Sequence, residues 1–240
     1  MRNMARRRFF VHEVRNGQAE ISGDEARHLT QVLRVEPGQV FELSDNNGLY
    51  LGQIDVARKS QVRFAIIERL PEPPPDVPMH LLVALFKFDR LELLLEKATE
   101  LGVTTVQFVR AERSDKGLER AAEKRIDRWR RIVTEASQQS RRRKLPELYE
   151  PVRFKEALRI EPGQKLFLDE DRSGASMIEA VKKDTPSIGV MIGPEGGWAD
   201  HEREGARQAG WTPVSMGEHI LRTETAAIAA LAVANAVLKR

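Results

Sequence analysis

The sequence has 240 residues, of which 41% are hydrophobic and 31% are charged, a composition that excludes a disordered or fibrous chain. It contains no cysteine, which excludes disulfides, thiolate nucleophiles and cysteine-based metal sites, and its five histidines lack ligand spacing, so we expect no metal site. The longest apolar run, Ala226–Leu238, is too short to span a bilayer, and no signal-peptide hydrophobic region is present. We therefore expect a cytoplasmic protein that does not associate with membranes.

The positive charges gather in two parts of the chain, although the net charge is only +3. Arg2, Arg6, Arg7 and Arg8 crowd the N-terminus, and a second series extends from Lys124 to Arg141-Arg142-Arg143-Lys144. Clusters of this kind neutralise phosphates, which supply much of the affinity for nucleic acids. Solvated helix faces would give the same pattern, so charge alone leaves both interpretations open.

Residues 1–70 predict a small β-barrel with one helix. The helix is expected over Asp24–Leu33, with Ser22 or Asp24 as its N-cap. Alternating or β-branched segments predict the strands, and Asp45-Asn46-Asn47-Gly48 predicts the turn between the first two. These predicted strands are Gln39–Leu43, Leu49–Val56 and Gln61–Leu70.

A proline-rich stretch, residues 71–78, follows this region. Its five prolines exclude the interior of a helix or sheet and favour an extended, semi-rigid linker. The sequence therefore predicts a second domain over residues 79–240.

Strands and helices alternate in the second domain, which predicts an α/β fold with a mostly parallel sheet. Met79–Phe86 is a continuous apolar run, typical of a strand that is covered on both faces. The next helix is expected to be capped by Asp89 and to end at Gly102. The remaining predicted elements are strands Val103–Val109, Lys165–Leu168, Ser187–Ile192 and Trp211–Met216, one long basic helix Leu118–Arg143, a helix of about ten residues from Asp200, and a last helix Thr223–Lys239.

The loop Ile192–Gly197, Ile-Gly-Pro-Glu-Gly-Gly, connects a buried strand to a helix. Ligands of open α/β sheets bind at the carboxyl ends of strands, and glycines let the backbone approach a flat ligand closely. The loop lacks the lysine of a Walker loop and the spacing of the dinucleotide fingerprint. It predicts a ligand crevice, with an ordinary strand-to-helix turn as the alternative.

A second glycine-bearing loop, Met216–Leu221, also connects a strand to a helix. Ile220 and Leu221 are apolar in a loop where nothing local requires them, so they are candidates to flank an aromatic ring such as adenine. The alternative is that they plug the edge of the sheet. Thr223 is the expected cap of the last helix.

Together the two loops resemble the signature of the SPOUT methyltransferases, and more narrowly that of the RsmE-type 16S ribosomal RNA uridine-N3 methyltransferases. Two departures are visible: Gln138 stands where the family often has an acidic residue, and Trp198-Ala199 removes a helix cap, so Asp200 is expected to cap instead. The other motifs that resemble this family are His28-Leu29 with Val32-Leu33-Arg34, Lys87 with Glu92 and Lys97–Val103, Arg113-Ser114, and Glu135-Ala136 with Gln139-Ser140 through Pro146.

The resemblance implies a PUA-like RNA-binding barrel followed by a SPOUT domain with a C-terminal trefoil knot, formed where the chain from about Ile188 threads through an earlier loop. It implies S-adenosylmethionine as the cofactor, and as the substrate the uridine at position 1498 of 16S rRNA in an assembled small ribosomal subunit. It also implies a homodimer with the active site at the subunit interface. The alanine-rich helix Thr225–Leu238 fits close packing in a dimer, although the interior helix of a monomer would look the same.

Uracil N3–H is a weak acid, so its methylation needs a base or a stabiliser of developing charge. Arg222 is the favoured stabiliser, and Glu195 or Glu224 is a candidate proton acceptor. The alternatives are that Glu224 complements the helix N-terminus and that Glu195 orders its own loop. The residues expected to bind the cofactor are Leu168, Ile192, Gly193, Pro194, Glu195, Gly196, Gly197, Met216, Gly217, Ile220, Leu221 and Arg222.

Basic residues are candidates for contact with RNA phosphates, with a solvated surface as the alternative for each. Two rival functions remain: a SPOUT enzyme that acts on tRNA or a ribose 2′-hydroxyl, and a non-catalytic RNA-binding ribosome assembly factor whose glycine loops are only turns. Binding of S-adenosylmethionine separates the enzymes from the assembly factor. The candidate RNA-binding residues are Arg6, Arg7, Arg8 and Arg34 in the first domain and Arg113, Arg142 and Lys144 in the second.

Overall fold

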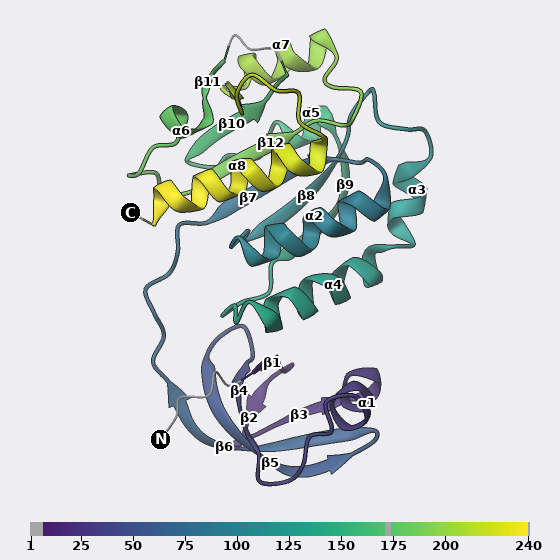
Figure 1. The fold of residues 1–240 in the computed structure, drawn as a ribbon, viewed down its shortest axis with the longest axis vertical. Helices are drawn as coiled ribbons and strands as arrows, with labels where there is room; N and C mark the ends of the chain where they lie inside the picture. Colours follow the sequence, from purple (N-terminus) through teal and green to yellow (C-terminus); the bar gives the residue numbers. More distant parts are fainter. Residues whose placement is uncertain (1–6, 171–173, 240) are drawn as a thin grey trace. The chain divides into compact units, whose positions relative to one another are not determined.

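A computed structural model describes residues 7–170 and 174–239 of the chain (Figure 1). The chain forms two compact units. The first takes the residues up to Pro74 together with Ser137–Leu145, and the second takes Pro75–Ala136 and the residues from Pro146 onward. No helix in the described ranges combines the length and the apolar character that a membrane crossing requires.

A six-stranded sheet forms most of the first unit. Helix α1 (Gly23–Gln31) packs against it and buries Ala26 and Leu29. The predicted hairpin is confirmed: its two strands pair antiparallel, and Asp45 Oδ1 accepts the N–H groups of Asn47 and Gly48 in the turn. In sheet order the strands are β1 (Arg8–Phe10), β4 (Val40–Ser44), β5 (Leu49–Arg58), β6 (Gln61–Leu70), β3 (Gln18–Ser22) and β2 (Val14–Arg15).

The segment Ser137–Leu145 belongs to this first unit although it lies far along the chain. The Ser44 hydroxyl donates to the Arg143 carbonyl at 2.6 Å, and the Leu145 N–H donates to Asn46 Oδ1 at 2.9 Å. The guanidinium of Arg8 donates to the Glu42 carboxylate and to the Arg141 carbonyl. These bonds satisfy polar groups of β1, β4 and the hairpin turn that folding removes from water.

A seven-stranded sheet, parallel at every pairing among the described residues, forms the centre of the second unit. This confirms the predicted α/β fold. In sheet order the strands are β11 (Ala175–Ser176), β13 (Thr212–Ser215), β10 (Gln164–Leu168), β12 (Ile188–Ile192), β7 (Met79–Ala84), β8 (Thr105–Arg110) and β9 (Glu147–Arg153). The helices that follow α1 are α2 (Phe88–Glu100), α3 (Leu118–Glu123), α4 (Ile126–Gln139), α5 (Phe154–Ala157), α6 (Met177–Ala180), α7 (Asp200–Gln208) and α8 (Thr223–Leu238).

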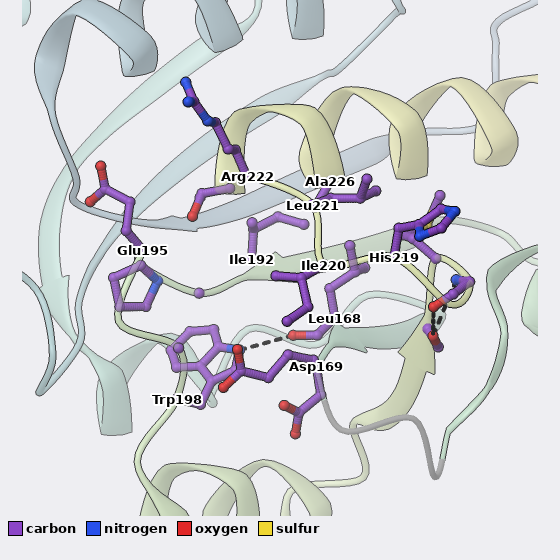
Figure 2. Close-up of a pocket in the computed structure, with 18 of the residues that line it drawn as sticks. Leu168, Asp169, Ile192, Glu195, Trp198, His219, Ile220, Leu221, Arg222 and Ala226 are labelled. Carbon is purple, nitrogen blue, oxygen red and sulfur yellow. Dashed lines mark hydrogen bonds between the residues drawn. The ribbon is translucent and has the colours of Figure 1, made fainter.

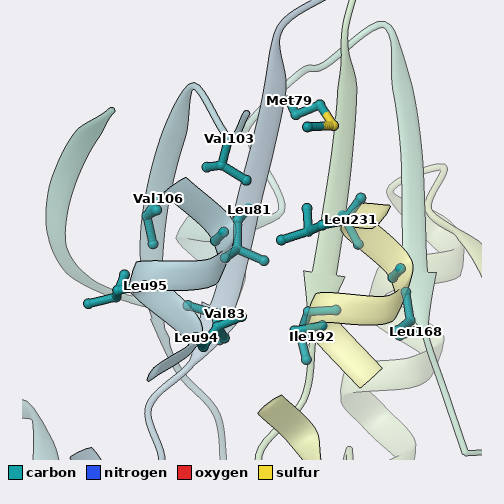
Figure 3. Packing of buried hydrophobic residues seen from close by; sticks show 14 of the residues in the cluster. Met79, Leu81, Val83, Leu94, Leu95, Val103, Val106, Leu168, Ile192 and Leu231 are labelled. Atoms are coloured by element: carbon teal, nitrogen blue, oxygen red, sulfur yellow. The ribbon is translucent and has the colours of Figure 1, made fainter. Parts of the chain in front are cut away.

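The central strands of this sheet are covered on both faces, as the continuous apolar run of β7 predicts. Leu81 and Val83 contribute to one hydrophobic cluster, where Figure 3 shows them with Leu94 of α2 and Leu231 of α8. The alternate residues of β7 contribute to a second cluster, which contains Trp198 and residues of α5 and α7. Burial on both faces fixes the strand ends that carry the candidate site.

The predicted long helix Leu118–Arg143 is wrong, because the structure divides it into α3 and α4. Nothing in the local sequence explains the interruption at Lys124 and Arg125. The earlier end, at Gln139, has a physical cause: Arg141 has a φ of 54°, a left-handed conformation that cannot continue a right-handed helix.

Three predicted helix caps are also wrong. Lys87, not Asp89, is the N-cap of α2, and Arg222, not Thr223, is the N-cap of α8. Ala199 takes the N-cap position of α7 and leaves Asp200 as the first helical residue. Alanine has no side-chain acceptor, so this cap depends on the Glu202 carboxylate, which accepts the Ala199 N–H at 3.0 Å.

Candidate functional site

A cavity of about 330 Å³ lies where β10, β12 and β13 end and α8 begins (Figure 2). Since β10 pairs with both β12 and β13, the loops that follow these parallel strands meet at one edge of the sheet. The cavity is lined by Arg90, Leu168, Asp169, Glu170, Ile192, Gly193, Pro194, Glu195, Gly197, Trp198, Ser215, Met216, Gly217, His219, Ile220, Leu221, Arg222, Thr223 and Ala226.

The first loop, Ile192–Gly197, is packed against the core. A hydrogen bond of 2.9 Å from the Gly197 N–H to the Pro194 carbonyl closes its turn. A Cβ atom at Gly193 would lie 3.0 Å from the indole of Trp198, which is only 1% exposed. The Trp198 indole N–H in turn donates to the Leu168 carbonyl at 3.0 Å. Gly193 is therefore required for close packing, and Trp198 connects the loop to the end of β10.

A buried carboxylate attaches the start of α7, which follows this loop, to the segment that follows β8. Glu202 is 2% exposed, and its two oxygens accept the Ala199 N–H at 3.0 Å and the Glu112 N–H at 2.9 Å. The neighbouring Arg113 donates from Nη1 to the Gly196 carbonyl at 3.1 Å. Sequence reasoning did not identify this role of Glu202, because the capping pattern gave no sign that one oxygen also binds another loop.

The second loop, Met216–Leu221, has fewer attachments among the described residues. Gly217 has a φ of 115°, a conformation that favours glycine, and its N–H donates to the Ser215 hydroxyl at 3.2 Å. Ile220 lines the cavity but is 83% exposed. An apolar side chain this open gains most from a ligand or partner that covers it.

Charged side chains surround the entrance of the cavity near the start of α8. Arg90 Nη1 lies 3.7 Å from Glu195 Oε1, and Arg90 Nε lies 3.8 Å from Glu224 Oε1. Glu224 is 8% exposed, and its Oε2 has no hydrogen-bond partner in the described structure. Arg222 is exposed, and its side chain makes no hydrogen bond or ion pair within the described ranges. Arg90 therefore holds two carboxylates, whereas Arg222 remains available for a ligand.

A second acidic group lies at the end of β10. Asp169 and Glu170 line the cavity directly after the strand. The Arg203 guanidinium donates from Nε to both oxygens of Asp169, at 3.1 Å and 2.8 Å. The hydrogen bonds to Asp169 raise the pKa of Arg203 above its usual value.

The structure brings most of the predicted site together. Every residue predicted to bind a cofactor lines the cavity except Gly196, whose carbonyl accepts from Arg113. Of the predicted catalytic residues, Arg222 and Glu195 line the cavity, and Glu224 lies against Arg90. The roles of these residues stay predictions.

Sequence reasoning missed several lining residues. The position of Asp169 and Glu170 after a predicted strand was a usable signal, since ligands bind at strand ends. No local pattern marks Arg90. The missed lining residues are Arg90, Asp169, Glu170, Trp198, Ser215, His219, Thr223 and Ala226.

Among the candidate RNA-binding residues, Arg8 needs correction. It is 8% exposed, and its donors are engaged by Glu42 and the Arg141 carbonyl, so it is not positioned to bind a phosphate. Arg7 and Arg34 are exposed, and Arg6 lies outside the described residues. Arg142 and Lys144 belong to the first unit, whereas Arg113 contacts the first glycine loop.

The α/β unit and the preceding sheet match known RNA methyltransferases. Residues 73–235 match the family model described as the RNA methyltransferase domain, and residues 21–67 match the RNA methyltransferase PUA domain. Two relatives are named ribosomal RNA small subunit methyltransferase E. The relative from Synechocystis is 34% identical over 88% of this chain and 71% of its own length, and that from Aquifex aeolicus is 29% identical over 94% and 97%.

Solved structures agree with the sequence relatives. A ribosomal RNA small subunit methyltransferase E from Neisseria gonorrhoeae, bound to S-adenosylmethionine, has a TM-score of 0.85 at 32% identity and covers 95% of both chains. A methyltransferase from Legionella pneumophila, in complex with the same cofactor, has a TM-score of 0.87 at 31% identity, over 97% of this chain and 98% of its own. The chain belongs to the ribosomal RNA small subunit methyltransferase E family.

Proposed function

We propose that this protein transfers the methyl group of S-adenosylmethionine to N3 of a uridine in the 16S RNA of the small ribosomal subunit. The observation that carries the proposal is the cavity formed by both glycine loops at the ends of β10, β12 and β13. The names of the relatives and the cofactor in two similar structures support it.

The residues of the cavity fit S-adenosylmethionine. Its volume, about 330 Å³, falls within the range of roughly 300–1,000 Å³ that is usual for small-molecule sites. Leu168, Ile192 and Leu221 provide apolar surface for a flat purine, and the carboxylates of Asp169 and Glu170 are suitable acceptors for ribose hydroxyls. When bound, the cofactor supplies a methyl group on a cationic sulfur.

The side chains at the entrance suit the proton chemistry of uracil. Arg222 is free to stabilise negative charge on the uracil oxygens as the N3 proton leaves. Glu195 lines the cavity and would accept that proton, directly or through water, while the new N3–carbon bond forms and the sulfur–carbon bond breaks. Glu224 does not line the cavity, so we assign it to holding Arg90 instead.

Titration calorimetry with S-adenosylmethionine, followed by mass spectrometry of ribosomal RNA, tests the proposal. The purified chain should bind the cofactor, and RNA from a strain that lacks the protein should lose one methyluridine of the small subunit. A chain that bound neither S-adenosylmethionine nor S-adenosylhomocysteine would indicate a non-catalytic RNA-binding factor. Loss of a methyl group from tRNA or from a ribose instead would assign a different specificity.

We further propose a homodimer that acts in the cytoplasm on the small subunit. The exposed Ile220 at the cavity, and Ile178 of α6 at 63% exposure, support a partner surface. The chain has a mass of 27.2 kDa. Light scattering of the protein in solution should give twice that mass. The trefoil knot also stays a prediction. In the sheet β10 lies between β12 and β13, so the chain passes β10 on its way from β12 to β13, and this order is compatible with a knot.

A further inference from the structure

A second cavity, of about 420 Å³, lies beyond the ends of β7 and β8. Because β7 pairs with β12 in a parallel sheet, this cavity and the first one open at the same edge of the sheet. Its lining residues are Leu85, Arg110, Ala111, Ser114, Asp115, Lys116, Gly117, Leu118 and Glu119.

Two side chains that line this cavity have buried donors without acceptors. Nε of Arg110 and Oγ of Ser114 are shielded from solvent, and neither has a hydrogen-bond partner in the described structure. The guanidinium of Arg110 also forms no ion pair with any described carboxylate. Buried polar groups of folded proteins are almost always paired, so a guanidinium and a hydroxyl left open in one cavity indicate a ligand that supplies acceptor oxygens.

The charged residues that line this cavity are balanced, two cationic and two acidic, so the two open donors, rather than the net charge, favour an anionic acceptor. Arg110 is the register partner of Arg153 in β9, which places two cationic residues at the same level of adjacent strands. Lys116 adds a third positive charge. The carboxylates of Asp115 and Glu119 also line the cavity, so the anionic group has to contact Arg110 and Ser114 directly.

The same loop connects this cavity to the proposed methyl-transfer site. Arg110 and Ser114 stand at its two ends, and Arg113 between them donates to the Gly196 carbonyl of the first glycine loop. An anion bound by Arg110 and Ser114 would therefore lie in a cavity that Arg113 connects to the first glycine loop. Two cavities connected in this way suit a nucleic-acid chain, which carries a phosphate at each nucleotide.

We propose that the cavity of Arg110 and Ser114 binds a backbone phosphate of the RNA substrate, next to the nucleotide that enters the first cavity. The inference rests on the proposed function for the identity of the substrate. The planar guanidinium binds the two non-bridging phosphate oxygens through paired hydrogen bonds, and the Ser114 hydroxyl donates to one of the same two oxygens.

Substitutions at these two residues test the site. We would compare Arg110→Gln and Ser114→Ala with the wild type and with Lys183→Gln, a control that removes one exposed positive charge before β12, at the opposite edge of the sheet. The probe is the small ribosomal subunit from a strain that lacks the protein. Filter binding gives its Kd at several salt concentrations, and calorimetry gives the Kd for S-adenosylmethionine.

Arg110→Gln should weaken subunit binding by about tenfold, because one phosphate contact is lost. The slope of the logarithm of the binding constant against the logarithm of the salt concentration, the salt slope, should fall in magnitude by about one. Ser114→Ala should weaken binding by about threefold with the salt slope unchanged, since it removes a neutral donor. Affinity for S-adenosylmethionine should stay within about twofold of the wild type in all variants. If Arg110→Gln fails to fold, Arg110→Lys keeps the charge without the paired donors and should give an intermediate loss.

Subunit binding by Arg110→Gln and Ser114→Ala equal to that of Lys183→Gln would overturn the phosphate site. The phosphate site would also be overturned if Arg110→Gln lost as much affinity for the cofactor as for the subunit. Arg110 would then act on the first cavity. Failure of the wild type to bind S-adenosylmethionine would instead refute the proposed function. Direct binding of the subunit still measures the phosphate contact in that case.

Discussion

The two glycine loops of the cavity occupy equivalent places in the sheet but are held differently. The loop Ile192–Gly197 packs against Trp198 and accepts a hydrogen bond from Arg113 in the segment that follows β8, to which Glu202 also attaches the next helix. The loop Met216–Leu221 has a serine–glycine hydrogen bond at its start and leaves Ile220 83% exposed. Both loops connect a strand to a helix, but the core fixes the position of the first loop, whereas the second loop needs a ligand to cover its apolar side chain.

This difference predicts two kinds of defect. Changes in the first loop should lower both the free energy of unfolding and the affinity for the cofactor, because its shape depends on the core. Changes in the second loop should lower affinity with little effect on stability. Four predictions follow this contrast, from the largest expected effect to the smallest.

Trp198→Ala should have the largest effect. Trp198 is 1% exposed, stacks on Phe167 and donates to the Leu168 carbonyl, so its truncation should lower the free energy of unfolding by about 3–5 kcal/mol and abolish cofactor binding. Urea unfolding and calorimetry measure the two effects. Trp211→Ala is the matched control, since Trp211 is equally buried in the same cluster but does not line the cavity. It should lose stability while keeping affinity, and an identical loss of affinity in both variants would refute a specific role for Trp198.

Gly193→Ala and Gly217→Ala compare the loops directly. A methyl group at Gly193 would press on the packed indole, which should lower the free energy of unfolding by about 1–3 kcal/mol and cofactor affinity by at least about tenfold. At Gly217 no atom lies within 4 Å of the added Cβ, and the exposed loop can relax its φ of 115°, so the stability loss should stay below about 1 kcal/mol. Equal stability losses in thermal unfolding would contradict the contrast between the loops.

Ile220→Ala should separate affinity from stability in the second loop. Because the side chain is 83% exposed, the free energy of unfolding should change by no more than about 0.5 kcal/mol. Affinity for S-adenosylmethionine should fall by roughly three- to tenfold if the ligand covers this side chain. Ile67→Ala, the same change at an exposed isoleucine of β6 in the first unit, should leave affinity unchanged. Unaltered cofactor affinity in Ile220→Ala would show that the ligand does not reach the second loop.

His80 provides the smallest effect, a pH dependence in the sheet that carries the first loop. Burial lowers the pKa of His80 below 6.5 in the folded state, so below about pH 6.5 the unfolded chain binds the proton more readily. The free energy of unfolding is highest above this pH, where His80 is neutral in both states, and it declines as the pH falls toward the lowered pKa. The difference in Tm between His80→Gln and the wild type should therefore shift in favour of the variant from pH 7.5 to pH 5.5, by about one or two degrees. A pH-independent difference would contradict it, and cofactor affinity at pH 7.5 should not change.

The sequence predicted the parts of the fold that depend on local pattern. Continuous apolar strands and the two glycine loops were sufficient to predict a parallel sheet with a ligand crevice, because strand ends of such a sheet always meet at one edge. Strand β9 was missed because its polar, mostly exposed residues carry no buried run. Its place is decided by pairing with β8, a tertiary contact that periodicity does not encode.

The site was predicted where a loop's own chemistry defined it and missed where packing did. Gly193 and Gly197 were found from the loop alone, whereas Arg90 reaches Glu195 and Glu224 only because α2 packs beside α8. Gly196 was placed with its neighbours but turns its carbonyl to Arg113, which no spacing rule reveals. Long-range contacts of this kind follow from the assembled core rather than from neighbours along the chain.

The attachment of Ser137–Leu145 to the first unit sets an order for folding during synthesis. Side-chain groups of Arg8, Ser44 and Asn46 bind main-chain groups of Arg141, Arg143 and Leu145. The sheet encoded at the start of the chain therefore cannot complete its hydrogen bonding until the ribosome has released a segment from beyond the middle of the sequence. A fragment that stopped at Pro74 would lack these partners, so the first unit is not a detachable module of the gene.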